Sequence, residues 1–168
     1  MNEAERKELH SKFHETGWTG SNKILYPVKC LPISELWASV PKAESLHRKP
    51  FYRNVMADIE RDGLMFPLLC VDATRQEMIA AKHRYKKSLC DLPFDINSPG
   101  DLTQQQYIIW GGSNRVRIAE DLGYTHIDCA IITSLQIAHR LQKDMRGPFK
   151  ERYYSAKPLT EKNRIKKV

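Results

Sequence analysis

Short apolar runs and amphipathic stripes alternate along this chain, and together they predict its secondary structure. Mostly apolar runs typical of buried strands lie at 66–71, 107–110 and 127–132. Apolar residues at helical spacing predict helices over 51–62, 113–122 and 134–145. This order of elements predicts a mixed α/β (α+β) fold, in which one small mixed sheet is flanked by helices.

Capping residues mark the ends of several predicted helices. Gly63 and Gly123 follow two of the stripes and are typical of C-terminal caps. Two residue pairs have the spacing of an N-terminal capping box, namely Thr74 with Glu77 and Thr133 with Gln136. The first pair opens a further helix that reaches about residue 89.

The first forty residues carry weaker signals. Residues 2–15 are highly charged and predict a helix, which a linker over 16–22 follows. The segment 23–33 has extended character but contains two prolines, so it predicts an edge or irregular strand. A short helical turn is predicted over 34–40.

The composition indicates one soluble domain with tails. The chain has 168 residues, of which 41% are hydrophobic, and this length allows a sizeable core. No apolar run approaches the ~20 residues of a membrane helix, and the N-terminus lacks the apolar segment of a signal peptide. We therefore expect a cytoplasmic protein with no membrane partner. The oligomeric state stays open, with a homodimer among the options.

An excess of basic residues predicts a polyanionic partner. The net charge is +7 and the pI is near 9.3. Residues 149–168 hold seven Lys or Arg against two Glu, a balance of +5. A second basic cluster follows one face of the helix after Thr74: Arg75, Lys82, His83, Lys86 and Lys87. The alternative is that the tail and this helix face are simply solvated.

The cysteines favour neither disulfides nor a metal site. Cys30, Cys70, Cys90 and Cys129 are far apart, and no C-x-x-C pair occurs. The last three lie in or beside apolar runs, which is typical of buried thiols in a reducing compartment. We therefore predict no metal site formed by protein side chains.

The stretch QYIIWGGSNRVRIAEDLG (106–123) has the pattern of an anion-binding junction. A strand runs through Gly111 and Gly112 directly into a helix, whose first-turn N–H groups point toward a ligand. Arg115 and Arg117 lie in that first turn, where the helix dipole is already positive. Cations are unfavourable there unless an anion lies beside them.

Two structural interpretations compete with a bound anion at this junction. Paired glycines before a helix are often only a tight connection. In addition, Arg115 and Arg117 have Glu120 and Asp121 within one or two helical turns, so intrahelical ion pairs are an alternative.

Two motifs in this chain resemble those of the ParB/sulfiredoxin superfamily. The stretch GLMFPLLCVD (63–72) is similar to the family's G-L-x-x-P-[IL]-x-V box. YIIWGGSNRVRIAEDLG (107–123) is similar to the later glycine-rich box, G-E-R-R-x-R-A-A-x-x-L-G in ParB proteins. The likeness covers roughly residues 24–133, and the chain resembles the short stand-alone ParB-like proteins of phages and mobile elements.

The resemblance implies a nucleotide ligand. Family members bind CTP or ATP at the second box, in some cases with Mg²⁺, and we expect a phosphate of this kind here. Residues expected at the phosphate site are Gly111, Gly112, Ser113, Asn114, Arg115 and Arg117, with Gly63 and Pro67 from the first box. Ser113 replaces the catalytic cysteine of sulfiredoxins, so sulfinic-acid reduction is excluded. Asn114 replaces one ParB arginine.

The resemblance also implies a division of the chain into segments. We expect an N-terminal helix and linker (1–22), a ParB/sulfiredoxin-like domain (23–147) with a helical insertion (72–105), and a basic tail (148–168). ParB proteins continue into a helix-turn-helix domain, which we do not expect here, and basic residues would replace it in weak, non-specific DNA binding. Those residues are Lys82, Lys86, Lys87, Lys150, Arg152, Arg164, Lys166 and Lys167.

Three functions follow from these observations. The first is a nucleotide-binding module that acts on or near DNA, as a phage or plasmid accessory in the host cytoplasm. The second is an enzyme, either an NTPase, a nuclease or a small-molecule kinase. For a nuclease the candidate carboxylates are Asp58, Glu60 and Asp62, and for a kinase the candidate bases are Glu35 and Asp72. The third is a non-catalytic partner-binding protein that keeps the fold.

Overall fold

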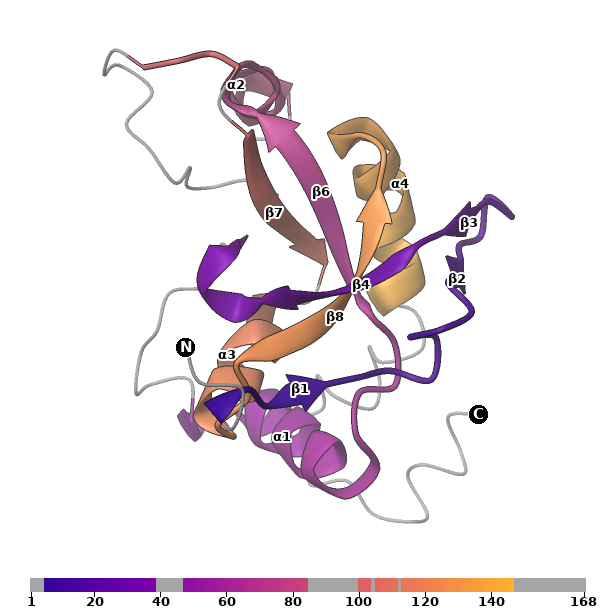
Figure 1. Ribbon diagram of the computed structural model, residues 1–168, viewed down its shortest axis with the longest axis vertical. Coiled ribbons are helices and arrows are strands. Elements are labelled where there is room, and N and C mark those ends of the chain that lie inside the picture. Colours follow the sequence, from indigo (N-terminus) through magenta and orange to yellow (C-terminus); the bar gives the residue numbers. More distant parts are fainter. Residues whose placement is uncertain (1–4, 39–46, 85–99, 104, 112, 147–168) are drawn as a thin grey trace.

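The three apolar runs form the centre of one mixed sheet in the computed structural model. The structure describes residues 5–38, 47–84, 100–103, 105–111 and 113–146. β6 (Leu68–Thr74) lies between β7 (Gln105–Gly111) and β8 (His126–Ile132), as Figure 1 shows. It pairs antiparallel with β7 and parallel with β8. The predicted mixed α/β fold is therefore confirmed.

Short strands complete this sheet at both sides. β5 (Leu36–Ala38) pairs parallel with β7. β1 (Glu8–Leu9) pairs parallel with β8, and β4 (Val28–Pro32) pairs antiparallel with β8. A separate two-stranded hairpin joins β2 (Trp18–Thr19) to β3 (Leu25–Tyr26).

One prediction for the first forty residues is wrong, and a second is right only in part. Residues 5–15 do not form the predicted helix, because the backbone at Glu8 and Leu9 pairs with β8 and buries the Leu9 side chain. The helical turn predicted over 34–40 is a 3-10 helix at Ile33–Glu35 followed by β5. Long-range strand pairing overrides local preference in both segments.

Four helices are formed among the described residues: α1 (Pro50–Asp62), α2 (Arg75–Arg84), α3 (Ser113–Asp121) and α4 (Leu135–Arg146). The three helices predicted from stripes correspond to α1, α3 and α4 within a residue or two. None of the described helices combines the length and apolar character that crossing a bilayer requires.

The helix caps agree with the sequence in most cases. Thr74 and Glu77 form the reciprocal capping box of α2, with two N–H to oxygen distances of 3.2 Å. Gly63 and Gly123 end α1 and α3 with φ values of +77° and +89°. The cap of α4 was predicted one residue too early, because Ser134 Oγ accepts the backbone N–H of Ile137 at 3.2 Å.

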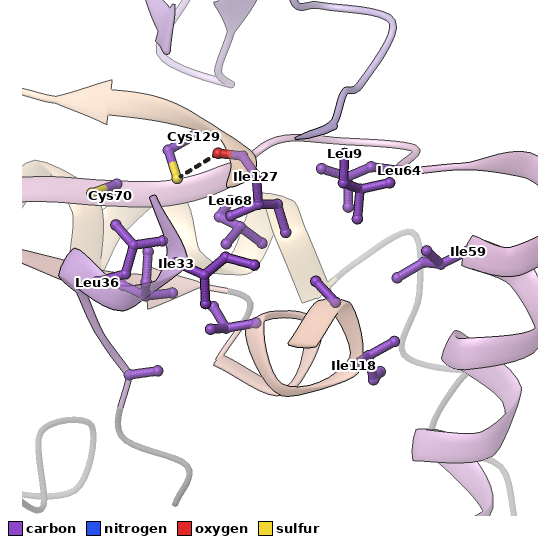
Figure 2. Close-up of a cluster of buried hydrophobic side chains, with 14 of the residues drawn as sticks. Leu9, Ile33, Leu36, Ile59, Leu64, Leu68, Cys70, Ile118, Ile127 and Cys129 are labelled. Atoms are coloured by element: carbon purple, nitrogen blue, oxygen red, sulfur yellow. Dashed lines mark hydrogen bonds between the residues drawn. The ribbon is translucent and has the colours of Figure 1, made fainter. Parts of the chain in front are cut away.

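Hydrophobic clusters lie on both faces of the sheet. Leu68 and Cys70 of β6 belong to the cluster that α1 and α3 cover, and Figure 2 shows Leu68 among its labelled side chains. The next residues along β6, Leu69 and Val71, belong to the opposite cluster, which contains Leu141 of α4. All four β6 side chains are fully buried. A central strand with both faces covered explains why its sequence is continuously apolar.

Candidate functional site

The predicted anion site lies where β7 meets α3. Gly111 is the last residue of β7, and α3 begins two residues later at Ser113. The ladder between β6 and β7 is irregular here, with a register shift between Leu69 and Cys70 beside the pairing of Leu69 with Gly111. Strand irregularities of this kind are frequent next to binding sites. Gly112 and the Ser113 side chain lie outside the described residues.

Arg115 connects the two sequence motifs. From the first turn of α3, its Nη1 donates to the carbonyl oxygen of Phe66 at 2.6 Å and its Nη2 to that of Pro67 at 3.4 Å. Both carbonyls precede β6, in the first box of the sequence. The side chain is only partly exposed and lines a small hollow with Gly63 and Leu64. Three predicted site residues, Gly63, Pro67 and Arg115, are thus brought together.

The acidic residues of α1 lie beside the same hollow. Asp58 and Asp62 both line it, and Arg61 Nη2 bridges them at 2.6 Å and 2.7 Å. Asp58 is buried rather than on the helix surface, and Glu60 is exposed and does not line the hollow. The Asp58–Asp62 pair is therefore held by an arginine, which is an arrangement that stabilises structure.

Arg117 forms an intrahelical ion pair with Glu120, one of the two structural alternatives that the sequence offered. Asp121 instead accepts a hydrogen bond from the Tyr52 hydroxyl at 2.6 Å and contacts His47 Nε2 at 3.2 Å. Burial, together with the Asp121 carboxylate, raises the pKa of Tyr52. These contacts join α3 to α1 and to the residues before it.

The two candidate bases for a kinase lie away from the junction. Asp72 pairs in register with Tyr107 of β7, and Glu35 immediately precedes the β5 residue that pairs with Tyr107. Burial and then Asp72 raise the pKa of the Tyr107 hydroxyl. Tyr107 precedes Gly111 by four strand residues, or about 13 Å at ~3.3 Å per residue. Neither carboxylate is thus beside the predicted phosphate position.

The basic helix differs from its prediction at Arg75. This side chain is 6% exposed, and its guanidinium lies so close to Gly100 that a Cβ there would meet it at 2.7 Å. Arg75 therefore does not belong to an exposed basic face, whereas His83 does. The side chain of Lys82 and the remaining predicted DNA-contacting residues lie outside the described part. Those remaining residues are Lys86, Lys87, Lys150, Arg152, Arg164, Lys166 and Lys167.

A second polar cluster was missed at the sequence level. Asp128, in the middle of β8, is completely buried, and the imidazoles of His10 and His14 both contact it at 3.0 Å. Cys30 pairs with Asp128 in register, and burial followed by the Asp128 charge raises its pKa to about 12. The H-x-x-x-H spacing was the available sequence signal, but its partner is more than a hundred residues away.

Comparison with solved structures gives distant similarities. The chain is similar to sulfiredoxin from Arabidopsis thaliana, with 13% sequence identity and a TM-score of 0.37. The match covers 69% of this chain and 96% of that chain. No family model and no curated protein matches the sequence. Membership of the ParB/sulfiredoxin superfamily therefore stays a prediction from the two sequence motifs.

Proposed function

We propose that the β7–α3 junction binds a phosphate of a nucleoside triphosphate, CTP or ATP, together with Mg²⁺. One observation carries this proposal: Arg115 projects from the first turn of α3 and is oriented by the carbonyls of Phe66 and Pro67. A phosphate is a ligand that an arginine guanidinium at a helix N-terminus binds well.

The phosphate in this proposal contacts backbone and side-chain donors together. The N–H groups of Ser113 and Asn114 belong to the first turn of α3, which has no preceding helical carbonyls to accept them. Gly111 lets the backbone approach the ligand closely. Arg117 follows Arg115 by two residues, about 200° around the helix, so we assign direct contact to Arg115 alone.

A non-catalytic protein that keeps this fold is the second candidate. The specific observation in its favour is that both arginines have protein acceptors, Arg115 two carbonyls and Arg117 the carboxylate of Glu120. In that case Arg115 would serve to hold α3 against the segment before β6.

Substituting Arg115 tests these two candidates against each other. We expect Arg115→Ala to weaken nucleotide binding about ten- to a hundredfold, because a charge-assisted contact contributes roughly 1.5–3 kcal/mol. The measurement is calorimetric titration with each of the four NTPs and Mg²⁺, below the melting temperature of each variant. Arg115→Lys retains the charge but not the planar fork, and should give an intermediate loss.

The matched control is Arg140→Ala, which removes an exposed arginine from α4. It should leave the nucleotide affinity unchanged. If wild-type protein binds none of the four nucleotides, or if Arg115→Ala lowers only the melting temperature, the non-catalytic candidate is correct.

We further propose weak, sequence-independent DNA binding by the basic helix and tail. Phosphate contacts release counterions, so the affinity should fall steeply as salt is raised. Reversing Lys82, Lys86 and Lys87 to Glu together should abolish binding in a fluorescence-anisotropy titration with a short duplex. Undiminished binding by the triple variant would mean that these lysines do not contact DNA.

A further inference from the structure

Two histidines converge on one oxygen atom of a buried carboxylate. His10 Nδ1 and His14 Nδ1 each lie 3.0 Å from Asp128 Oδ1. The two rings are tilted by 39° with centroids 3.9 Å apart. Asp128 is 0% exposed, whereas the histidine side chains are 37% and 39% exposed, so the cluster opens to solvent on the histidine side.

His10 has a carboxylate at each of its ring nitrogens. Its Nε2 lies 2.7 Å from Glu8 Oε2, and its Nδ1 faces Asp128 Oδ1. A neutral imidazole carries a single N–H and can donate to only one of them. The other nitrogen then presents a lone pair to a carboxylate oxygen, which is unfavourable unless a positive charge lies between or on the two groups.

We propose that this cluster is a zinc site, with His10 Nδ1, His14 Nδ1 and Asp128 Oδ1 as its protein ligands. At bond lengths of about 2.0–2.1 Å, tetrahedral coordination separates two ligand atoms by about 3.3 Å. The observed separation from each Nδ1 to Oδ1 is 3.0 Å, so each has to open by only a few tenths of an ångström. The ligand atoms of all three residues already lie within 4.8 Å of one another.

Surrounding groups orient these ligands as they do in zinc sites. Glu8 Oε2 lies 2.7 Å from His10 Nε2 and would accept its proton when a metal is bound, which would leave Nδ1 available to the metal. The second oxygen of Asp128, Oδ2, accepts the backbone N–H of Ser11 at 2.8 Å and the Ser11 hydroxyl at 3.4 Å. Only Oδ1 is therefore directed at the two imidazoles.

The ligand atoms favour a divalent ion that is intermediate between hard and soft. Two imidazole nitrogens and one carboxylate oxygen suit Zn²⁺, whereas Mg²⁺ and Ca²⁺ prefer oxygen ligands alone. Three protein ligands would leave a fourth position for a water molecule. Such a zinc ion would also fasten the residues after β1 to β8.

Metal titration of the full chain tests the site. Protein stripped with a chelator is titrated with ZnCl₂ and, separately, with MgCl₂ in a calorimeter. We expect one equivalent of Zn²⁺ to bind and to raise the melting temperature, and Mg²⁺ to produce neither effect. Glu8→Gln should lower the zinc affinity about ten- to a hundredfold, and His14→Ala should lower it further.

The matched control is His83→Ala, because His83 is an exposed histidine on α2, outside the cluster. It should bind zinc as the wild type does. If His14→Ala fails to fold without metal, His14→Gln is used in place of His14→Ala, because glutamine keeps a hydrogen-bond donor for Asp128. Absence of zinc binding in the wild type, or equal binding by the His14 variant, would show that the cluster is a hydrogen-bonded support and not a zinc site.

Discussion

Leu68→Ala and Leu69→Ala are each expected to lower the free energy of unfolding by about 2–5 kcal/mol, the range for removing a buried leucine side chain. The two residues are neighbours on β6, point to opposite faces of the sheet, and are both 0% exposed. Each substitution opens a cavity in a different cluster, because helices cover both faces. Urea unfolding followed by circular dichroism measures both effects.

Leu25→Ala is the matched control for these two variants. Leu25 lies in the hairpin strand β3 and is 63% exposed, so its truncation should change the free energy of unfolding by less than about 0.5 kcal/mol. If only one of the two β6 variants is destabilised, one face of the sheet is not packed as described.

Asp128→Ala, measured in the presence of a chelator, is expected to destabilise the protein by about 1–3 kcal/mol, because a buried donor loses its acceptor. The substitution leaves the buried backbone N–H of Ser11 without its acceptor. It also removes the shared acceptor of His10 and His14, so the residues after β1 should separate from β8 first.

Hydrogen exchange can locate this effect. Amide protection should fall most over residues 8–14, while the α4 amides keep the exchange order of the wild type. Asp128→Asn preserves the side-chain shape and an acceptor for Ser11, so it should lose less stability. Asp72→Ala, at an exposed position of β6, is the neutral control. Equal protection in wild type and Asp128→Ala would contradict an anchoring role for Asp128.

Local signals were sufficient for the central elements. The apolar runs predicted β6, β7 and β8, since strands buried on both faces need apolar side chains at successive positions. The Thr74–Glu77 capping box and the Gly63 and Gly123 caps were also predictable, because each depends on residues within one helical turn.

The sequence likewise predicted that Arg115 lies in the first turn of α3. It did not predict which groups the Arg115 side chain contacts. Its hydrogen-bond acceptors, the carbonyls of Phe66 and Pro67, are nearly fifty residues away. The local pattern offered only Glu120 and Asp121 as partners. Antiparallel pairing of β6 with β7 decides the actual contact, since it brings the start of one strand to the end of the other.

Tertiary structure alone determined the conformation of the N-terminal segment and the formation of the cluster at Asp128. The charged residues 5–15 favoured a helix by composition, but pairing with β8 buries the Leu9 side chain in a way that an isolated helix cannot. His10 and His14 meet Asp128 across 118 and 114 positions of the chain. A spacing pattern predicts only which residues are neighbours on one helix or strand. The two histidines meet Asp128 because β1 and β8 lie side by side.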